Sequence, residues 1–453
     1  MEPFRYHVFI CDQEKPEGVP CCAARGSGKT LEALRRGIAM RGLMDSVQIT
    51  VCGSLGLCER GPNMVVYPEG VWYSNVTPQD VPEILESHFQ GRRPVERLVN
   101  KDAAALSAEI RTNRDRMLAA LRAKDAAGAL PDDLQQRIRG FQESRVILTA
   151  LELDLFTAVG EGAAAPQVAG KIGGNARATE KLMNALVAVG LLTKQDGTFR
   201  NTPASARYFV EGSKDNARLA LMHTAHLWRR WSTLTECVRA GTSVTYQERA
   251  HRSEDWTQAF IAAMHRNASG RAPLVVAAVG TEGIERMLDV GGGSGAYSIA
   301  FAKASEKIRA EIVDLPAVLP IAQGHIRNAG LADRIQTREG DLRQDEFGTG
   351  YNLVFVSAIC HMLSEKENRD LLKRCQAALA PAGRIVIQDF VLENDKTAPK
   401  MAALFALNML VGTQEGSSYS EEEYAAWLRE AGFRDVRRIR LPGPSNLMVG
   451  TRA

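Results

Sequence analysis

The period of hydrophobic and polar positions changes several times along the chain, and each change marks a different kind of segment. In residues 1–100, short apolar runs alternate with helical stretches, which predicts a small α/β unit. Residues 101–140 place apolar side chains at helical spacing among many Ala, Arg, Asp and Lys residues, which predicts a helical linker. Residues 141–265 predict compact helices and a hairpin, and residues 266–453 predict alternating buried strands and helices.

The third segment begins with three short helices and a hairpin. We expect helices at 144–158, 167–172 and 178–189, followed by a hairpin at 191–200 that turns at Asp196-Gly197. This order predicts a winged-helix domain. A DNA-reading third helix would carry basic residues, but this one is apolar at Leu182, Met183, Leu186 and Val187, so we expect dimerisation and no nucleic-acid binding.

A glycine-rich stretch follows in the last segment. Residues 287–295 read Met-Leu-Asp-Val-Gly-Gly-Gly-Ser-Gly and predict a buried strand that breaks into a tight turn before a helix. A second strand ends at Asp314 and a third segment ends at Asp341, so two carboxylates are expected at one sheet edge, the first for ribose hydroxyls and the second near an adenine amino group. The glycines stand closer than in Gly-x-Gly-x-x-Gly, which favours S-adenosylmethionine over a dinucleotide, although such turns also occur where nothing binds.

These features together resemble the S-adenosylmethionine-dependent O-methyltransferases that dimerise through an N-terminal winged-helix domain. The shared stretches include Glu311-Ile-Val-Asp-Leu-Pro316, Gly340-Asp341 and Ile359-Cys-His-Met-Leu363, and the resemblance covers residues 140–453. It implies an α/β fold with a helical dimerisation and substrate-lining domain at 141–265, a Rossmann-like domain at 266–453 and a homodimer. It implies cofactor contacts from Gly291, Gly292, Gly293, Gly295, Asp314, Leu315, Asp341, Leu342 and Ser357.

The same resemblance assigns the catalytic residues. His361 matches the family's catalytic base, and Asp389 aligns with one of the carboxylates around it. The position of the other carboxylate falls near Ser418, so Glu415 is a substitute candidate. Plant members follow the histidine with Asp-Trp, whereas Met362-Leu363 stands here, and a capping or core role for the histidine remains the alternative.

The methyl acceptor is expected to be a small, largely apolar or aromatic molecule. Its pocket is predicted to be lined by Met222, Trp228, Trp231, Trp256, Phe260, Met264, Phe405, Asn408 and Met409, of which about half are expected to contact ligand and the rest to be core. A hydroxyl acceptor is the first hypothesis. The alternatives are a thiol, amine or carbon acceptor on the same fold, or a redox-sensing or electron-transfer protein whose cofactor-binding half does not turn over.

Five of the eight cysteines lie within the first sixty residues. Together with Gly56-Leu-Cys58-Glu-Arg-Gly-Pro62 and the following Tyr-Pro-Glu-Gly, residues 1–100 resemble the thioredoxin-like ferredoxins that hold a 2Fe-2S cluster. The resemblance implies Cys11, Cys22, Cys52 and Cys58 as ligands, although family spacing would place the third ligand at Ser54. A module without its cluster and a zinc site are the alternatives, and Gly26-Ser-Gly-Lys-Thr30 lacks the first glycine of a nucleotide-binding P-loop.

Charge and composition exclude some partners. The formal net charge is +3 with 24% charged residues, which argues against a broad nucleic-acid or acidic-membrane surface. No stretch reaches the roughly eighteen apolar residues of a membrane span, so we expect a soluble, cytoplasmic protein. Its expected partners are the small-molecule acceptor, a second copy of the chain and a redox partner for the iron-sulfur domain.

Overall fold

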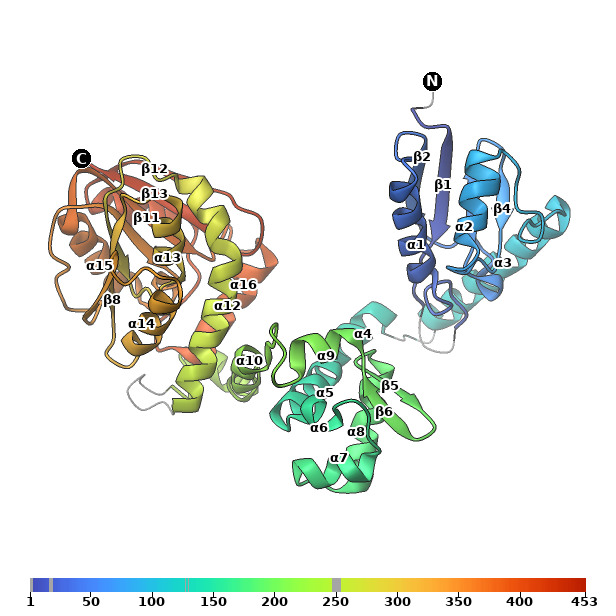
Figure 1. Cartoon of the computed structure of the whole chain (residues 1–453), viewed down its shortest axis with the longest axis horizontal. Coiled ribbons are helices and arrows are strands. Elements are labelled where there is room, and N and C mark those ends of the chain that lie inside the picture. The colour runs from blue at the N-terminus through green and yellow to red at the C-terminus, as the bar shows by residue number, and fades with distance from the viewer. Residues whose placement is uncertain (1–2, 16–18, 127, 129, 247–253) are drawn as a thin grey trace. The chain divides into compact units, whose positions relative to one another are not determined.

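The protein is described from a computed structural model, which covers residues 3–15, 19–126, 128, 130–246 and 254–453. The chain forms two compact units, Met1–Gly140 and Phe141–Ala453 (Figure 1). Among the residues so described, no helix combines the length and the apolar character that crossing a bilayer requires.

The first unit contains a four-stranded sheet in the order β2-β1-β3-β4. Strand β1 (Tyr6–Cys11) is parallel to β2 (Val47–Cys52) and antiparallel to β3 (Met64–Tyr67), which pairs with β4 (Val71–Tyr73). Apolar side chains of the sheet pack against α1 (Ser27–Met40), α2 (Val81–Glu83) and its π-helical continuation η2 (Ile84–Gln90). The α/β prediction for these residues is confirmed.

The segment predicted as a helical linker forms α3 (Ala103–Ala126) and α4 (Asp132–Arg139). Helix α3 is docked on the rest of the first unit by several polar contacts. Arg60, at the end of the short helix η1 (Cys58–Arg60), pairs with Glu109, and the Asn113 side chain donates to the Gly56 carbonyl at 2.8 Å. The first part of the linker is therefore docked on the cysteine-bearing unit.

The second unit begins with a helical bundle and a hairpin. Asp154 adopts a left-handed φ of 50°, so the single helix expected at 144–158 is wrong and two helices form there instead. The hairpin is confirmed, with positive φ at both turn residues, Asp196 and Gly197, as a type I′ turn requires. The elements are α5 (Phe141–Glu152), α6 (Leu155–Val159), α7 (Ala165–Ile172), α8 (Ala176–Ala188), β5 (Leu192–Gln195), β6 (Thr198–Asn201) and α9 (Pro203–Phe209).

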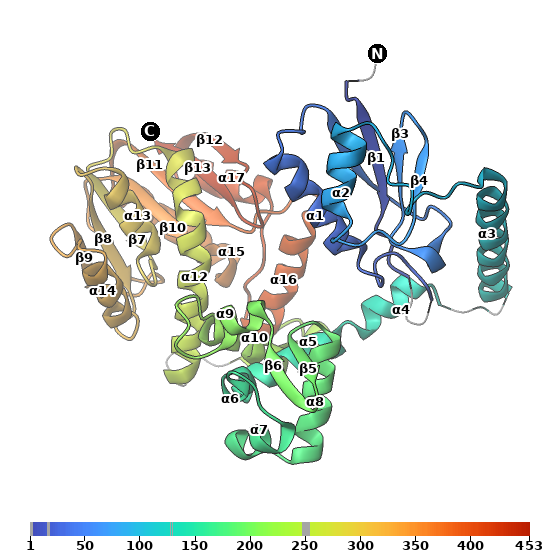
Figure 2. The same ribbon diagram turned by 45° about the vertical axis from the view of Figure 1, so that its right-hand side comes forward.

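Three further helices connect this bundle to the large sheet. They are α10 (Arg218–Trp231), α11 (Leu234–Ala240) and α12 (Glu254–Val279), and α12 is the long upright helix in Figure 2. Helix α10 packs on both α5 and α12, and α12 also packs on α13 (Ala296–Ala304). These three helices thus connect the bundle to the part of the unit that carries the glycine-rich stretch 291–295.

A seven-stranded sheet in the order β12-β13-β11-β10-β7-β8-β9 forms the rest of this unit. The strands from β11 to β9 are parallel to their neighbours, and β13 and β12 are antiparallel. This is the predicted Rossmann-like α/β arrangement. The strands are β7 (Arg286–Val290), β8 (Arg309–Asp314), β9 (Ile335–Glu339), β10 (Tyr351–Ser357), β11 (Leu379–Asp389), β12 (Phe433–Ile439) and β13 (Asn446–Arg452).

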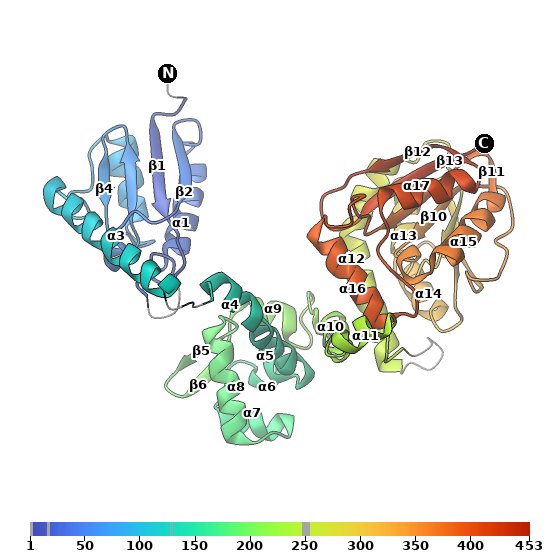
Figure 3. The same cartoon turned by 180° about the vertical axis from the view of Figure 1, so that it is seen from behind.

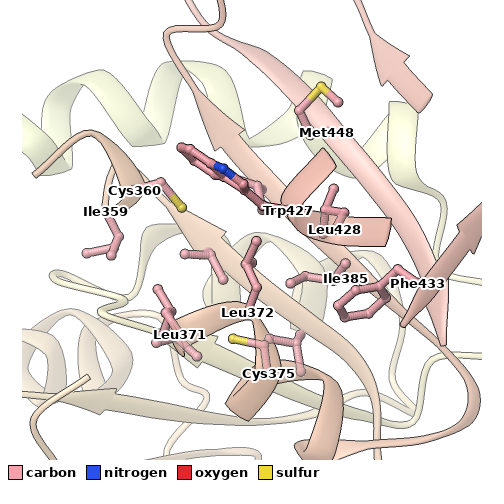
Figure 4. Packing of buried hydrophobic residues seen from close by; sticks show 14 of the residues in the cluster. Ile359, Cys360, Leu371, Leu372, Cys375, Ile385, Trp427, Leu428, Phe433 and Met448 are labelled. Atoms are coloured by element: carbon pink, nitrogen blue, oxygen red, sulfur yellow. The ribbon is translucent and has the colours of Figure 1, made fainter. Parts of the chain in front are cut away.

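Helices cover both faces of this sheet, and each face has its own apolar core. Helices α12, α13 (Ala296–Ala304) and α14 (Leu319–Asn328) pack on one face. Helices α15 (Glu365–Ala378) and α17 (Glu421–Glu430) cover the other, which Figure 3 shows from behind. That second core places Trp427 and Phe433 among aliphatic side chains (Figure 4).

The edge strand β12 is irregular. Its register against β13 shifts between Arg434 and Arg437, and Asp435 has a left-handed φ of 52°. The shift and the φ value are those of a β-bulge, which bends the last strand of the sheet.

Candidate active site

The glycine turn lies at the carboxyl end of β7. Gly291, Gly293 and Gly295 all have positive φ, between 59° and 76°. A Cβ on Gly291 would collide with the Ile359 side chain, and one on Gly292 would lie 2.7 Å from the Asp289 carboxyl carbon. Glycine is therefore required here both by the backbone conformation and by the close approach of neighbouring side chains.

Two carboxyl groups, those of Asp314 and Asp289, contact the glycine turn. Asp314, at the end of β8, accepts hydrogen bonds from the Gly293 and Leu315 amides at 2.8 and 2.7 Å. Asp289 is completely buried and accepts from the Ser298 hydroxyl at 2.7 Å. Burial raises the pKa of Asp289 to about 7, with a further contribution from the Asp314 charge. Asp314 thus holds the turn by a hydrogen bond, and the Asp289 carboxyl packs closely against Gly292.

The remaining predicted cofactor residues surround the same edge. Leu342 lies beside Gly291 together with Ile359, and Asp341 is half-exposed, with one carboxylate oxygen accepting from the Arg343 amide. The Ser357 hydroxyl donates to Gln388 on the next strand at 2.9 Å. The structure therefore brings these residues together at the carboxyl edge of the sheet, where parallel sheets bind nucleotide-like ligands.

His361 and Asp389 form a buried pair at the ends of neighbouring strands. His361 lies in the one-turn helix η4 (Cys360–Met362) that follows β10, and Asp389 ends β11. The two Asp389 oxygens bond His361 twice, at 2.7 Å to Nδ1 and at 3.2 Å to the backbone amide. His361 is 6% exposed and Asp389 1%. Since Nδ1 is engaged, Nε2 is the nitrogen that remains to accept a proton.

Cys360 faces away from this pair. Its side chain is fully buried in the core on the α15 and α17 side of the sheet, close to Trp427 (Figure 4). Burial raises its pKa well above the usual value of a thiol. Cys360 therefore fills the core, whereas its neighbour His361 carries the acid–base group.

Aromatic rings enclose His361. Phe390 and Phe405 stack with their centroids 3.9 Å apart, and Phe405 meets the imidazole edge-on at 4.8 Å. Phe405 is on α16 (Lys400–Gly412), and Phe390 follows Asp389. These contacts place apolar ring surface directly beside the candidate base. Phe390 was missed by the sequence reasoning, although it directly follows Asp389.

Only some of the predicted acceptor residues gather here. The Trp231 indole donates to the Asn408 side chain at 2.9 Å and so joins α10 to α16, the helix of Phe405. Met222 and Trp228 instead pack against the core of the helical bundle. Phe260 meets the His223 ring edge-on, Met264 is half-buried on the same helix and Met409 is 7% exposed. The side chain of Trp256 lies outside the described residues.

Glu415 is exposed in the loop after α16. The same loop touches the candidate base through its backbone, because a Cβ on Gly416 would collide with the His361 carbonyl. Asp389, and not Glu415, is thus the carboxylate that contacts the imidazole.

The four predicted thiol ligands of the first unit lie near the carboxyl ends of two parallel strands. Cys11 and Cys52 are register partners, and Cys11 is hydrogen-bonded to Cys22, which lowers the pKa of Cys11 and raises that of Cys22. Cys58 accepts from the Lys15 ammonium at 3.1 Å and lies 3.3 Å from the Ser54 hydroxyl. Within the described residues, no three His, Cys, Asp or Glu side chains are arranged to hold a metal ion.

Two family models match the second unit. The O-methyltransferase dimerisation domain matches residues 135–211, and the O-methyltransferase domain matches residues 231–434. Among curated proteins, 3-hydroxy-5-methyl-1-naphthoate 3-O-methyltransferase of Streptomyces sahachiroi is 34% identical over 71% of this chain and 96% of its own length. Acetylserotonin O-methyltransferase of Bos taurus is 30% identical over 68% of this chain and 94% of its own.

One further relative and two solved structures cover a similar share of the chain. An L-tyrosine C(3)-methyltransferase of Streptomyces lavendulae is 28% identical over 67% of this chain and 88% of its own length. The structure titled PigF with SAH has a TM-score of 0.65 at 27% identity and covers 71% of this chain and 100% of that one. Human N-acetylserotonin methyltransferase in complex with SAM has a TM-score of 0.62 at 25% identity, covering 71% and 96%.

Proposed function

Because the chain belongs to the O-methyltransferase family, it is an S-adenosylmethionine-dependent methyltransferase, and we propose that it methylates a hydroxyl group on a small aromatic molecule. The observation that carries the proposal is the buried His361–Asp389 pair beside the stacked rings of Phe390 and Phe405. A general base is needed for a hydroxyl acceptor, and the rings supply a surface for a planar substrate.

In this proposal each protein group has a separate task. His361 Nε2 takes the proton of the acceptor hydroxyl while the oxygen forms its bond to the methyl carbon and the carbon–sulfur bond breaks. Asp389 holds the imidazole through Nδ1 and stabilises the imidazolium that results. S-adenosylmethionine supplies an electrophilic methyl group on a positively charged sulfur. The glycine turn and Asp314 bind this cofactor and orient it. Beyond proton transfer, the gain in rate then comes from holding the methyl group in line with the acceptor oxygen.

Relatives guide the choice of acceptor. The similar curated proteins are named for a hydroxynaphthoate, a tetracenomycin polyketide and acetylserotonin, each with fused rings. We therefore propose a fused-ring phenol or naphthol as the acceptor. The tyrosine C(3)-methyltransferase among the relatives keeps a carbon acceptor as the main alternative.

The test is methyl transfer from labelled S-adenosylmethionine to a panel of naphthols, phenols, thiols and amines. We expect the label in an aryl methyl ether, identified by mass spectrometry. Label on carbon, sulfur or nitrogen would replace the hydroxyl proposal, and cofactor binding without any transfer would favour the redox alternative.

The match to a dimerisation domain supports a homodimer. Light scattering should then give a mass near twice the 49.5 kDa of one chain. Full activity in a strict monomer would contradict this assembly.

We propose a second role for residues 1–100, as a thioredoxin-like domain that binds a 2Fe-2S cluster through Cys11, Cys22, Cys52 and Cys58. The support is the position of Cys11, which is the register partner of Cys52 and is hydrogen-bonded to Cys22 at one end of the sheet. Thiolates are the usual ligands of iron-sulfur clusters, and metal binding often completes the assembly of its own site. Anaerobic reconstitution with iron and sulfide, followed by absorption and iron analysis, tests the proposal.

A further inference from the structure

The glycine turn has one side-chain contact that no predicted cofactor residue accounts for. Ser294, between Gly293 and Gly295, is 4% exposed, and its hydroxyl lies 2.9 Å from Nδ1 of His265 on α12. The second ring nitrogen, Nε2, lies 3.3 Å from the Ser269 hydroxyl one turn further along the same helix. Both nitrogens of His265 are therefore engaged, and one of them contacts the turn itself.

A second histidine packs against the ring of the first. His325, in the last turn of α14, stacks on His265 with ring centroids 3.7 Å apart and an interplanar angle of 12°. Three elements thus meet at one point, namely the turn after β7, helix α12 and helix α14. A stack of this kind fixes the plane of the His265 ring and hence the direction of its Nδ1 lone pair.

We propose that His265, backed by His325, is a positioning residue that holds Ser294 and the glycine turn in the shape that binds S-adenosylmethionine. The inference rests on the proposed placement of the cofactor at this turn. It adds a residue of α12, the helix that also carries the acceptor candidates Phe260 and Met264, to the determinants of cofactor binding.

The hydrogen-bond pattern is compatible with a neutral His265, because each ring nitrogen faces a hydroxyl that can donate or accept. In the tautomer with a proton on Nε2, that nitrogen donates to Ser269, and Nδ1 accepts from the Ser294 hydroxyl. Burial lowers the pKa of both histidines, and the charge of His325 lowers that of His265 further. Protonation would turn Nδ1 from acceptor into donor and place two like charges in stacking contact.

The other charged groups near the turn do not offset the lowering of the His265 pKa. Asp314 and Asp289 contact the turn at Gly293 and Gly292, and Arg266 and Arg327 are sequence neighbours of the two histidines. Among the described residues, His325 is the charged group that shifts the pKa of His265. Because both pKa values are lowered from 6.5, both rings are neutral at neutral pH, and the arrangement is lost as the pH falls through these lowered pKa values.

The experiment measures the dissociation constant of S-adenosylmethionine by calorimetry on the full-length protein between pH 7.5 and 5.5. For the wild type we expect weaker binding at acid pH, by up to about tenfold per pH unit for each linked proton below the pKa. His265→Asn keeps an acceptor in the place of Nδ1 without a titrating ring, so its binding at pH 7.5 should stay near wild type and its pH dependence should flatten. His265→Phe keeps the stack but loses the acceptor, and should bind about two- to tenfold more weakly at pH 7.5.

Two controls make the outcome specific. His7→Asn removes another half-buried histidine whose Nε2 also lies near a hydroxyl, that of Thr50 at 2.7 Å, and should keep the wild-type pH dependence. Proton release on binding at pH 6, measured in buffers of different ionisation enthalpy, should fall in His265→Asn. Circular dichroism at each pH confirms that the proteins remain folded.

The proposal is overturned by wild-type affinity at pH 7.5 in His265→Phe, by an unchanged slope in His265→Asn, or by loss of the slope in His7→Asn. A different result marks failure of the cofactor placement itself. If Asp314→Ala binds S-adenosylmethionine as tightly as wild type, the turn is not the site, whatever the histidine variants do.

Discussion

The two candidate sites of this protein lie at the carboxyl ends of parallel strands, yet their side chains are held in different ways. In the large sheet, Asp389 already bonds His361 and Asp314 already bonds the glycine turn. In the small sheet, the thiol of Cys11 is hydrogen-bonded to that of Cys22, whereas Cys58 accepts a hydrogen bond from Lys15. Hydrogen-bonding groups of the chain itself thus preorganise the site of the large sheet, whereas the described thiols of the small sheet form no group that is already arranged to hold a metal ion.

The largest expected effect comes from removing the base of the preorganised site. His361→Ala should lower the turnover number by about 10²- to 10⁴-fold, because it removes the imidazole that Asp389 holds through Nδ1. Affinity for S-adenosylmethionine should not change, which calorimetry checks. Asp389→Asn is the matched variant, and an intermediate loss is expected because Asn keeps an acceptor for Nδ1 but no charge. Wild-type turnover in His361→Ala would remove the histidine from the chemistry.

The cofactor side of the same site should respond next. Asp314→Ala removes a carboxylate that the sequence assigns to the ribose hydroxyls and that also holds the Gly293 amide. Loss of charge-assisted hydrogen bonds worth about 1.5–3 kcal/mol predicts roughly tenfold to over a hundredfold weaker binding. Asp435→Ala, on the exposed edge strand, is a control that should bind normally.

A smaller effect is expected at the link between α10 and α16. Trp231→Phe keeps the aromatic packing and removes the hydrogen bond to Asn408, which should raise KM for the acceptor about two- to tenfold and leave cofactor affinity unchanged. Steady-state kinetics with both substrates separates the two effects. An increase in KM for the cofactor alone would assign this contact to cofactor binding instead of acceptor binding.

The smallest effect on methyl transfer is expected in the thiol unit. Cys52→Ala should abolish the absorption and iron content of the reconstituted cluster, and Ser54→Ala should not. Methyl transfer should survive in part, because no step of the displacement needs an electron. The reverse pattern of the two variants would assign the third ligand to Ser54, and activity that disappears with the cluster while the protein stays folded would show that this unit controls the chemistry.

Sequence reasoning located the parts of the fold that are set by local chemistry. The turn at Asp196-Gly197 and the strand that ends at Asp314 were predicted because glycine and alternating apolar residues act over a few positions. The break at Asp154 was not predicted, since its left-handed conformation is chosen by packing and not by the helical pattern around it.

The candidate site shows the same limit. His361 and Asp389 were predicted from the resemblance, and their contact spans 28 positions of the sequence. The stack of His265 on His325 joins two helices sixty positions apart, and neither residue belongs to a recognised pattern. Pairings of this kind depend on how helices pack on the sheet, which the period of one segment does not contain.

The irregular strand β12 has a consequence for how the molecule assembles. An enzyme that pairs with a second copy through its helical bundle still exposes a sheet edge on each copy, and a straight edge invites further strands to add. The bulge at Asp435 bends this edge, and the exposed charges of Arg434 and Arg437 would be brought together by any copy added there. The bend and these like charges thus disfavour the addition of a further strand at the β12 edge.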